Sequence, residues 1–410
     1  MQSAWLSRLF FAVVAAIGVA GVVSGTACTR WGKPGPVPPT IAPLSAIFVD
    51  PHTGSDTSGN GSSAKPYKTL TKAVAVLAAS KNRSQSGVTI TLATGDYVAA
   101  NGEKFPIVVP ASVTINGTNY GMGPSSGTFI DGVGQDTIFE NLVHAPARTA
   151  YATLEVIPPA NVNLGDVYVG ASKISLPSSR AGYSSLDVIG AVLAGNSAFG
   201  AGIVTSLRNV SGVLVAGGSF NCGSCQIQAN DFGIGALAVP AATSSPGAGV
   251  PTVTLTRSVG DSTIAAKIVD VITDGSANVT VSNSAFNRAA YAFEDALPQA
   301  VPRTAPGAID FGGGAGGSTG GNSFIGARRT EIAVTRRSEA VSALDDVWNP
   351  NQQGANRNGQ YPHKVTFKPG AAGKNVTVLG GAQASTVTVG PAAAPSPTPS
   401  GSPGPTASPT

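Results

Sequence analysis

Short apolar segments alternate with polar turns along most of the chain. Residues 88–92, 107–109 and 113–115 are examples, and Gly, Pro and Asn stand between them. Runs of this length that are rich in Val, Ile and Thr and bounded by turn-forming residues are typical of β-strands. The pattern therefore predicts an all-β fold made of many short strands.

One segment has a different period. Leu70, Ala73, Val74 and Leu77 recur at the spacing of one face of an amphipathic helix, which predicts a helix over about residues 69–80. The first coil of a solenoid exposes strand edges and apolar core unless something covers it. We predict that this helix caps the N-terminal end of such a solenoid.

A repeat supports the solenoid. Val192 and Val213 stand 21 residues apart, each in a similar apolar context, and the string Asn-Ser-Ala-Phe occurs at 196–199 and again at 283–286. A period near 21 residues suits one coil of a β-helix, in which equivalent side chains of stacked coils form ladders. Positions separated by about one such period are therefore expected to be neighbours.

Several motifs near the start of the body resemble a known family. They are Phe48-Val-Asp50-Pro, Gly54-Ser-Asp56, Gly61-Ser-Ser, Pro66-Tyr-Lys-Thr69-Leu, Ala93-Thr-Gly95-Asp-Tyr97 and Phe105-Pro-Ile-Val. The set resembles the bacterial family called domain of unknown function 1565, which is regarded as part of the pectate-lyase-like group. A second stretch, from Asp310-Phe-Gly-Gly-Gly to Val347-Trp-Asn, looks like that family's closing coils. The resemblance implies a single-stranded, right-handed parallel β-helix over residues 46–390.

The chain begins with the features of a secretory leader. Residues 1–27 contain Arg8, an apolar run over 9–23 and small residues before Cys28. The run is short for a bilayer core that needs about 20 apolar residues, so we expect cleavage and export. Cys28 would then be the first residue, which resembles a bacterial lipoprotein signal, although Gly25 stands where that pattern prefers Leu. Acylation of Cys28 and anchoring to the cell envelope are expected, with free secretion as the alternative.

The cysteines agree with export. Cys222 and Cys225 are close enough in sequence to pair locally in an oxidising compartment, which leaves Cys28 alone and gives its acylation a reason. A thioredoxin-like site would need a helix after this motif, and a zinc site would need further ligands, whereas the chain has only three histidines. A structural disulfide in a turn is the favoured interpretation.

Composition defines the rest of the chain. Residues 28–45 are rich in Pro and Gly and predict an extended spacer, and residues 391–410 contain only Pro, Ala, Ser, Gly and Thr and predict a disordered tail. The body between them, with 42% hydrophobic and 11% charged residues overall, should be folded. A net charge of +4 without a basic stripe does not indicate nucleic-acid binding.

The sharpest chemical hypothesis is a charged ladder. Asp166, Asp187 and Arg208 follow the same spacing of 21 residues. Stacked carboxylates could hold calcium, and an arginine beside them could meet an acidic sugar or act in a lyase. The alternative is an exposed ladder whose pairs each contribute less than about 1 kcal/mol. We favour the alternative, so no catalytic residue is assigned, and no cofactor is expected unless calcium binds there.

A second oxygen-rich group occurs near the N-terminal end of the body. Asp50, Asp56 and Asn60 lie beside Gly, where Asp and Asn usually form turns, so a structural loop is favoured over a calcium site. The sequence as a whole predicts a cell-envelope protein with a structural or polysaccharide-binding surface. The alternative is a polysaccharide lyase or hydrolase that acts on acidic glycans.

Overall fold

The structure is a computed structural model, and the chain divides into two units, Met1–Pro43 and Leu44–Thr410, of which only the second contains described residues. The described residues are 45–80, 87–119, 126–135, 150–171, 182–188, 191–195, 197–201, 210–229, 231–238, 250–256, 262–266, 269–286, 289–295, 307–324, 330–334, 340–343, 346–348, 364–367, 376–378 and 386–389.

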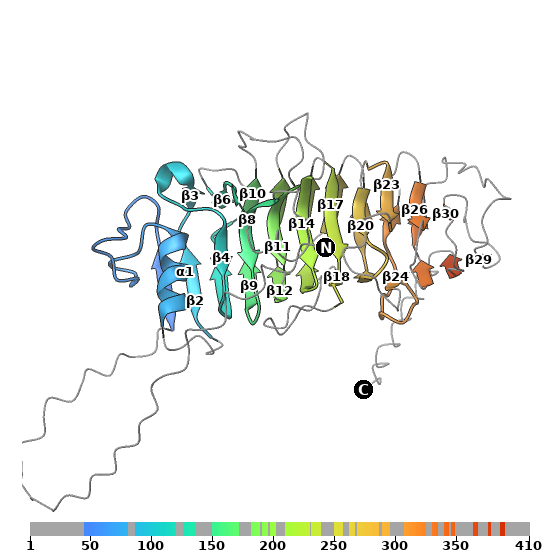
Figure 1. Ribbon diagram of the computed structural model, residues 1–410, viewed down its shortest axis with the longest axis horizontal. Helices are drawn as coiled ribbons and strands as arrows, with labels where there is room; N and C mark the ends of the chain where they lie inside the picture. Colours follow the sequence, from blue (N-terminus) through green and yellow to red (C-terminus); the bar gives the residue numbers. More distant parts are fainter. Residues whose placement is uncertain are drawn as a thin grey trace, which may run out of the picture. The chain divides into compact units, whose positions relative to one another are not determined.

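Three parallel sheets make up the body (Figure 1). Sheet 1 consists of β1 (Ala46–Val49), β2 (Thr89–Leu92), β5 (Val113–Asn116), β9 (Asn161–Gly165), β12 (Ala191–Gly195), β15 (Ser219–Gly223), β18 (Thr252–Thr256), β21 (Asn278–Val281), β24 (Ala308–Gly312), β27 (Ala340–Ala343), β31 (Thr386–Val389) and β29 (Lys364–Phe367). Sheet 2 consists of β3 (Gly95–Val98), β6 (Thr128–Asp131), β10 (Tyr168–Ala171), β13 (Ala198–Ala201), β16 (Gln226–Ala229), β19 (Ser262–Ala266), β22 (Ser284–Phe286), β25 (Ser323–Phe324) and β28 (Val347–Trp348). Sheet 3 consists of β4 (Ile107–Val109), β8 (Ala150–Val156), β11 (Gly182–Val188), β14 (Val210–Ala216), β17 (Phe232–Leu237), β20 (Val269–Thr273), β23 (Tyr291–Glu294), β26 (Thr330–Val334) and β30 (Val376–Val378).

The order of these strands defines a parallel β-helix. From β2 to β28 the described strands pass from sheet 1 to sheet 2 to sheet 3 and back, and each pairs with the equivalent strand of the next coil. Among the described strands, all pairs are parallel except that β7 (Gly134–Gln135) pairs antiparallel with β8. The predicted all-β parallel fold is confirmed. Parallel crossover connections are right-handed in nearly all proteins, which agrees with the expected hand.

Alternation of side chains builds the core. In β9, Val162 and Leu164 are buried while Asn161 and Asn163 are exposed, as expected for a strand with one face inside. Large aromatic side chains fill the interior of the later coils: Phe286 and Phe324, of neighbouring sheet 2 strands, stack with ring centroids 4.7 Å apart, and Phe311 of sheet 1 meets Phe324 edge to face at 5.3 Å. The core is therefore continuous between coils rather than divided into domains.

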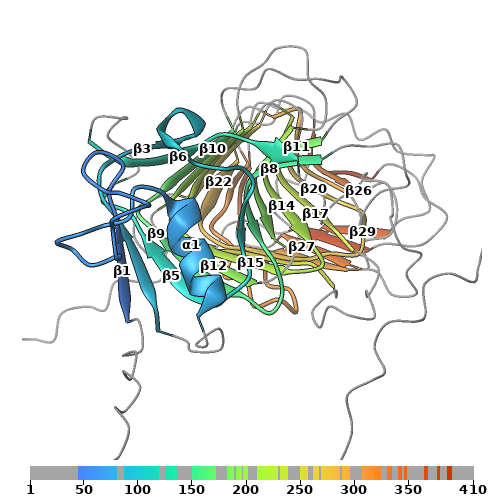
Figure 2. The same cartoon turned by 60° about the vertical axis from the view of Figure 1, so that its left-hand side comes forward.

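The single α-helix among the described residues, α1 (Leu70–Ala79), lies at the N-terminal end of the sheets, where Figure 2 shows it in front of the first coils. The side chains of Leu70, Ala73, Val74 and Leu77 join the core, so the apolar face found in the sequence is the buried face. Thr69 is the N-cap and accepts a hydrogen bond from the Lys72 N–H at 3.0 Å. The helix thus covers apolar side chains of the first coils.

Coils of one fixed length are not found. Val192 pairs with Val162 of the preceding coil and with Phe220 of the next, and neither partner lies at the predicted spacing. Val213 belongs to sheet 3, where its partner Ile234 does lie at that spacing. The predicted period was wrong because the strands stay in register while the turns between them differ in length. The two Asn-Ser-Ala-Phe strings nevertheless end in equivalent strands, β13 and β22 of sheet 2.

No helix in the described part of the chain is long and apolar enough to span a membrane. The predicted leader, spacer and tail, together with Cys28, lie outside the described residues.

Candidate functional site

The outer surface of sheet 1 carries a set of uncharged polar side chains, which we call the polar face. Its members share an outward position and a hydroxyl or amide group, and each is exposed or half-buried. They are Thr89, Thr91, Thr114, Asn116, Asn161, Asn163, Asn221, Thr252, Thr254, Asn278 and Thr280.

Strand register aligns these side chains into columns. In one column Thr89 is followed by Thr114 and Asn163, and further along Asn221 is followed by Thr254 and Thr280. Neighbouring members stand about 4.8 Å apart, the distance between hydrogen-bonded strands. The amide of Asn163 donates a hydrogen bond to Thr114 Oγ1 at 3.4 Å, so side chains of adjacent coils interact along the column.

One apolar side chain interrupts the polar face. Leu193 lies between Asn163 and Asn221 in the same column, and its side chain is 53% exposed. Only one other large apolar side chain among the described residues, Val250, has comparable exposure. Single exposed apolar side chains are common on protein surfaces, so the exposure of Leu193 alone does not indicate a partner.

A glycine-rich loop ends the polar face at its C-terminal side. Asp310 occupies the next position after Thr280 but is only 1% exposed, because its carboxylate accepts hydrogen bonds from the N–H groups of Gly314 at 2.9 Å and Ser318 at 3.1 Å. The loop backbone passes so close that a Cβ on Gly316 would lie 2.4 Å from Thr280 Oγ1. The second motif found in the sequence thus folds a loop over the sheet.

Asp166 and Asp187, which the sequence placed in register, lie on different parts of the coil. Asp166 follows β9 in the turn between sheets 1 and 2, whereas Asp187 is in β11 of sheet 3. Arg208 lies outside the described residues. The predicted ladder of Asp166 and Asp187 was wrong, because the coils that contain them are longer than the predicted period.

The backbone conformation at residue 166 explains why an aspartate stands there. Its φ of 53° is left-handed, and so are those of Ser224 (61°) and Asn283 (48°), which occupy the equivalent turn in later coils. Asp and Asn tolerate this conformation better than most residues with a side chain. Asp166 therefore has a structural role in a recurring turn.

Asp187 has an acidic neighbour that the sequence did not reveal. Its partner in β8 is Glu155, in the adjacent coil, so both carboxylates belong to the outer side of sheet 3. Asp187 is 1% exposed and Glu155 is 0% exposed. The Ser184 hydroxyl donates a hydrogen bond to Asp187 Oδ1. Glycoside hydrolases use two carboxyl groups that flank the substrate, whereas these two side chains are almost completely buried. The sequence separation of the two acids exceeds the predicted period, so the repeat could not have revealed the pair.

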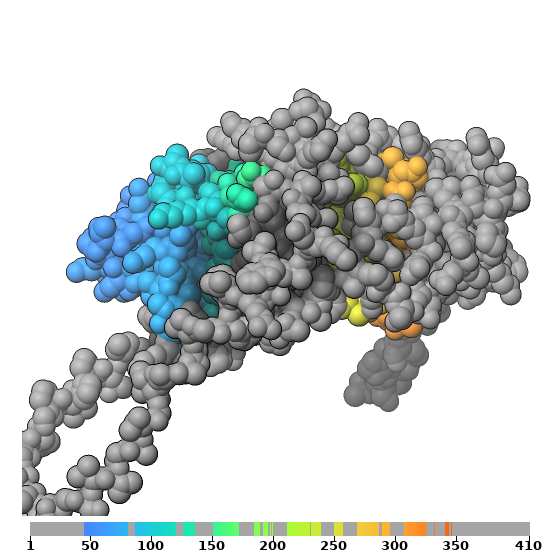
Figure 3. All heavy atoms as spheres, viewed as in Figure 1, coloured from blue at the N-terminus to red at the C-terminus, as the bar shows by residue number. Residues whose placement is uncertain are grey.

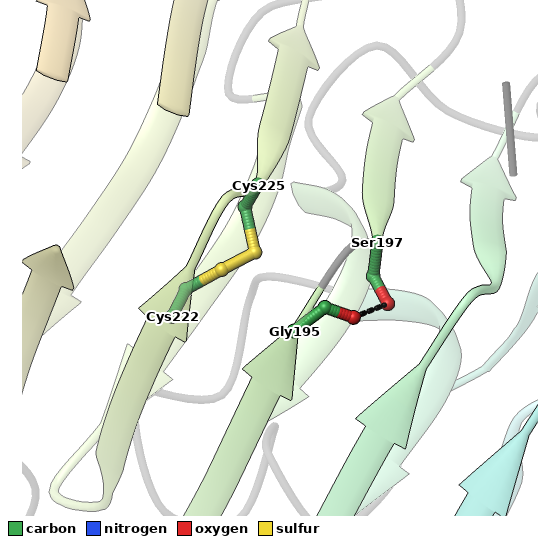
Figure 4. Close-up of a disulfide and its surroundings, with 4 residues drawn as sticks. All are labelled: Gly195, Ser197, Cys222 and Cys225. Atoms are coloured by element: carbon green, nitrogen blue, oxygen red, sulfur yellow. Dashed lines mark hydrogen bonds between the residues drawn. A yellow bond between two sulfur atoms is a disulfide. The ribbon is translucent and has the colours of Figure 1, made fainter. Parts of the chain in front are cut away.

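Cys222 and Cys225 are joined as a disulfide in the turn from β15 to β16, as Figure 4 shows. Their Cα atoms are 6.1 Å apart, and both side chains are buried, Cys222 in an inward position of sheet 1. Ser197 lies in the equivalent turn of the preceding coil, where its hydroxyl donates to the Gly195 carbonyl at 2.9 Å. The disulfide thus lies in the same turn that a hydrogen bond closes in the preceding coil.

Acidic residues of the N-terminal part of the body, the part that Figure 3 colours blue, serve turns and the helix. The Asp50 carboxylate accepts hydrogen bonds from the N–H groups of His52 and Thr53, at 2.8 and 3.1 Å. Asp56 accepts from the Lys68 N–H at 2.8 Å and from the Thr69 N–H at 3.0 Å. Burial, the largest single influence, acts to raise the pKa of Asp50, but the hydrogen bonds from Thr53 and His52 together lower it.

Within the described residues, no group of three or more His, Cys, Asp and Glu side chains could hold a metal ion. Asp50 and Asp56 instead direct their oxygens to N–H groups of the loop.

A known family model matches part of this chain. Residues 52–146 match the family model described as "Protein of unknown function (DUF1565)". The predicted resemblance is confirmed over those residues, whereas the second stretch that resembles the family lies outside the match. No curated protein matches the chain.

Several solved structures are similar to it. The pectin methylesterase from Aspergillus niger is 13% identical, with 86% of this chain and 87% of that chain covered and a TM-score of 0.37. The GH136 lacto-N-biosidase from Eubacterium ramulus is 8% identical, with 84% and 68% covered and a TM-score of 0.36. Pectate lyase Pel9A is 12% identical, with 85% and 76% covered and a TM-score of 0.35. The strand pairing described above establishes the parallel β-helix independently of these likenesses.

Proposed function

We propose that the protein is an exported surface protein whose polar face binds an uncharged polysaccharide. The observation that carries this proposal is the column of threonine and asparagine side chains on sheet 1, held in register from coil to coil. Hydroxyl and amide groups donate and accept hydrogen bonds, as sugar hydroxyls require.

The spacing of the coils also suits a linear glycan. Successive coils rise by about 4.8 Å, which is close to the length of one hexose residue in an extended chain. A glycan lying along the coil axis would meet an equivalent pair of side chains at each sugar. Leu193 would then contact the apolar C–H face of a ring in the middle of this surface.

Charge supports a neutral ligand over an acidic one. No Lys or Arg occurs in the strands of sheet 1 from β2 to β21, and these are the residues that recognise carboxylates and phosphates. We therefore place uncharged glycans ahead of pectin-like acids as the ligand. The proposal needs no cofactor, so a chelator of divalent cations should leave binding unchanged.

Binding to a glycan panel with a neutral and an acidic series tests the proposal. Thr254→Arg places a long charged side chain on the polar face and should weaken binding roughly tenfold or more, the effect of losing about 1.4 kcal/mol. The matched control is Gln228→Arg, an equally outward position on sheet 2, which should bind as the unaltered protein does. Equal loss in both variants, or a preference for acidic glycans, would contradict the proposal.

The rival function is a hydrolase or lyase, and the buried Glu155–Asp187 pair is the candidate for its acidic groups. The same glycans are incubated with the protein and assayed for new reducing ends and for unsaturated products. Binding without turnover supports a binding protein. Turnover that Asp187→Asn abolishes would replace our proposal by the enzymatic one.

Anchoring at the cell envelope is part of the proposal and rests on residues 1–28 of the sequence. When bacteria that produce the protein grow with a labelled fatty acid, the protein should become labelled. The substitution Cys28→Ser should abolish the label and release the protein into the medium. An unlabelled parent protein found in the medium would leave free secretion as the answer, and a labelled Cys28→Ser variant would show that the fatty acid is attached at another residue.

A further inference from the structure

Sheet 2 carries an aromatic and acidic surface near the N-terminal end, separate from the polar face. Strands β3, β6 and β10 lie side by side there (Figures 1 and 2). Asp96, Phe129 and Tyr168 are ladder partners on their outer side, and Asp131 lies two residues after Phe129 on the same side. All four side chains are half-buried. We call them the aromatic–acid patch.

Glycines let the two rings lie close to the sheet. A Cβ on Gly170 would lie 2.4 Å from the Tyr168 ring, and a Cβ on Gly127 would lie 2.3 Å from the Asn119 carbonyl oxygen and 2.8 Å from the Phe129 ring. A side chain at Gly170 would displace the Tyr168 ring, whereas one at Gly127 would meet the Asn119 backbone as well as the Phe129 ring. The ring centroids are 5.3 Å apart and the planes are inclined by 41°. Both rings keep part of their surface in contact with solvent.

The acids give the patch a negative charge beside those rings. Asp131 is the ladder partner of Gly170, against which the Tyr168 ring lies. Burial, and then the charge of Asp131, raise the pKa of the Tyr168 hydroxyl, which agrees with a carboxylate close to it. Aromatic rings and carboxylates together attract a cation.

We infer that the aromatic–acid patch binds a protonated amine, such as the ammonium group of a de-N-acetylated amino sugar. The ring faces contribute a cation–π contact and the carboxylates accept the ammonium hydrogens. A neutral sugar would contact the rings but bring no positive charge to the carboxylates, and so charge complementarity decides for the amine. The binding of an amine at this patch does not depend on the proposed function. The further suggestion that a polysaccharide carries this amine rests on the proposed function.

A pair of oligosaccharides tests the inference: a short glucosamine oligomer and its fully N-acetylated equivalent, titrated calorimetrically into the mature protein. The glucosamine oligomer should bind, and acetylation should weaken binding roughly tenfold. Binding should also weaken as added salt screens the charges, and as rising pH deprotonates the amine. Equal affinity for both oligomers would overturn the inference and indicate stacking of a neutral sugar.

Single-residue variants test whether glucosamine binds at the aromatic–acid patch. Asp131→Asn keeps the shape of the side chain and removes its charge, and Phe129→Leu keeps an apolar group and removes the ring, so each should weaken glucosamine binding several-fold. Gln226→Ala, in the same ladder as Tyr168 two strands away, is the control and should bind normally. Unchanged binding by Asp131→Asn, with native circular dichroism, would overturn the inference.

The polar face is tested separately from the patch. Thr254→Arg should leave glucosamine binding unchanged, since Thr254 lies on sheet 1. If the Thr254→Arg variant no longer binds neutral glycans but still binds the glucosamine oligomer, both proposals stand. If neutral glycans fail to bind at all while glucosamine binding depends on Asp131, only the proposed function fails.

Discussion

One buried carboxylate, that of Glu103, joins the first turn of the capping helix to the coils. It accepts hydrogen bonds from the Leu70 N–H at 2.6 Å and from the Thr71 N–H at 2.9 Å, both at the start of α1. The Thr71 hydroxyl is a third donor, at 2.6 Å. Glu103 is 5% exposed, so little water can replace it. We expect Glu103→Ala to weaken the attachment of the helix, whose apolar face still packs against the coils.

The size of the effect follows from these contacts. Each buried donor left without an acceptor costs about 1–3 kcal/mol, and a carboxylate at a helix N-terminus contributes about 0.3–1 kcal/mol more. Water that enters the vacated space recovers part of this, so we expect Glu103→Ala to lower the free energy of unfolding by about 2–4 kcal/mol. Urea unfolding measures the loss, and hydrogen exchange of the α1 amides locates it. The control is Lys104→Ala, an exposed neighbour, which should change neither.

The pH dependence of the same group has a definite sign. Burial raises the pKa of Glu103 above the value of 4.5 in the unfolded chain, although hydrogen bonds from Thr71 and Leu70 oppose the shift. Between those two pKa values the folded state holds a proton that the unfolded state has released, so the free energy of unfolding falls as pH rises through this window. Glu103→Gln should not show this fall. The reasoning is refuted if the parent protein gains stability relative to Glu103→Gln as pH rises above 4.5.

Two further predictions concern a turn and the core. Asp166→Val should lower the free energy of unfolding by about 1–2 kcal/mol, because a β-branched residue is strained at a φ of 53°, whereas Asp166→Gly should be neutral or stabilising. Urea unfolding of the pair checks this, and equal loss in both variants would speak for a side-chain role. Phe286→Ala should lower the free energy of unfolding by about 3–5 kcal/mol, because its ring packs against Phe311 and Phe324. A loss below about 1 kcal/mol would show that the later coils are not packed as described.

The fold was predictable because its signals are local. The alternation of β-strand residues, the apolar face of α1 and the N-terminal motif each depend on neighbouring residues. The first two match the structure, and the motif matches the family model. The polar face also has a local signal, because outward Thr and Asn alternate with inward Val, Ile and Leu in strands such as β2, β9 and β18. Reading that alternation across strands would have found the face.

The acidic pair of Glu155 and Asp187 could not be found in this way. Which residues become neighbours between coils depends on the length of every intervening turn, and coil lengths here differ from one turn to the next. The same dependence made the predicted ladder of Asp166 and Asp187 wrong. The aromatic–acid patch combines β3, β6 and β10, so its pattern also emerges only once the strands are paired.

Hydroxyl-radical footprinting of Leu193 tests the polar face most directly. The side chain of Leu193 is 53% exposed and reacts in the free protein, while the half-buried Tyr291 of sheet 3 serves as a reference away from the face. With a bound neutral polysaccharide, we predict that oxidation of Leu193 falls strongly and that oxidation of Tyr291 does not change. Full reactivity of Leu193 in a saturated complex would contradict the assignment of the polar face as the binding surface.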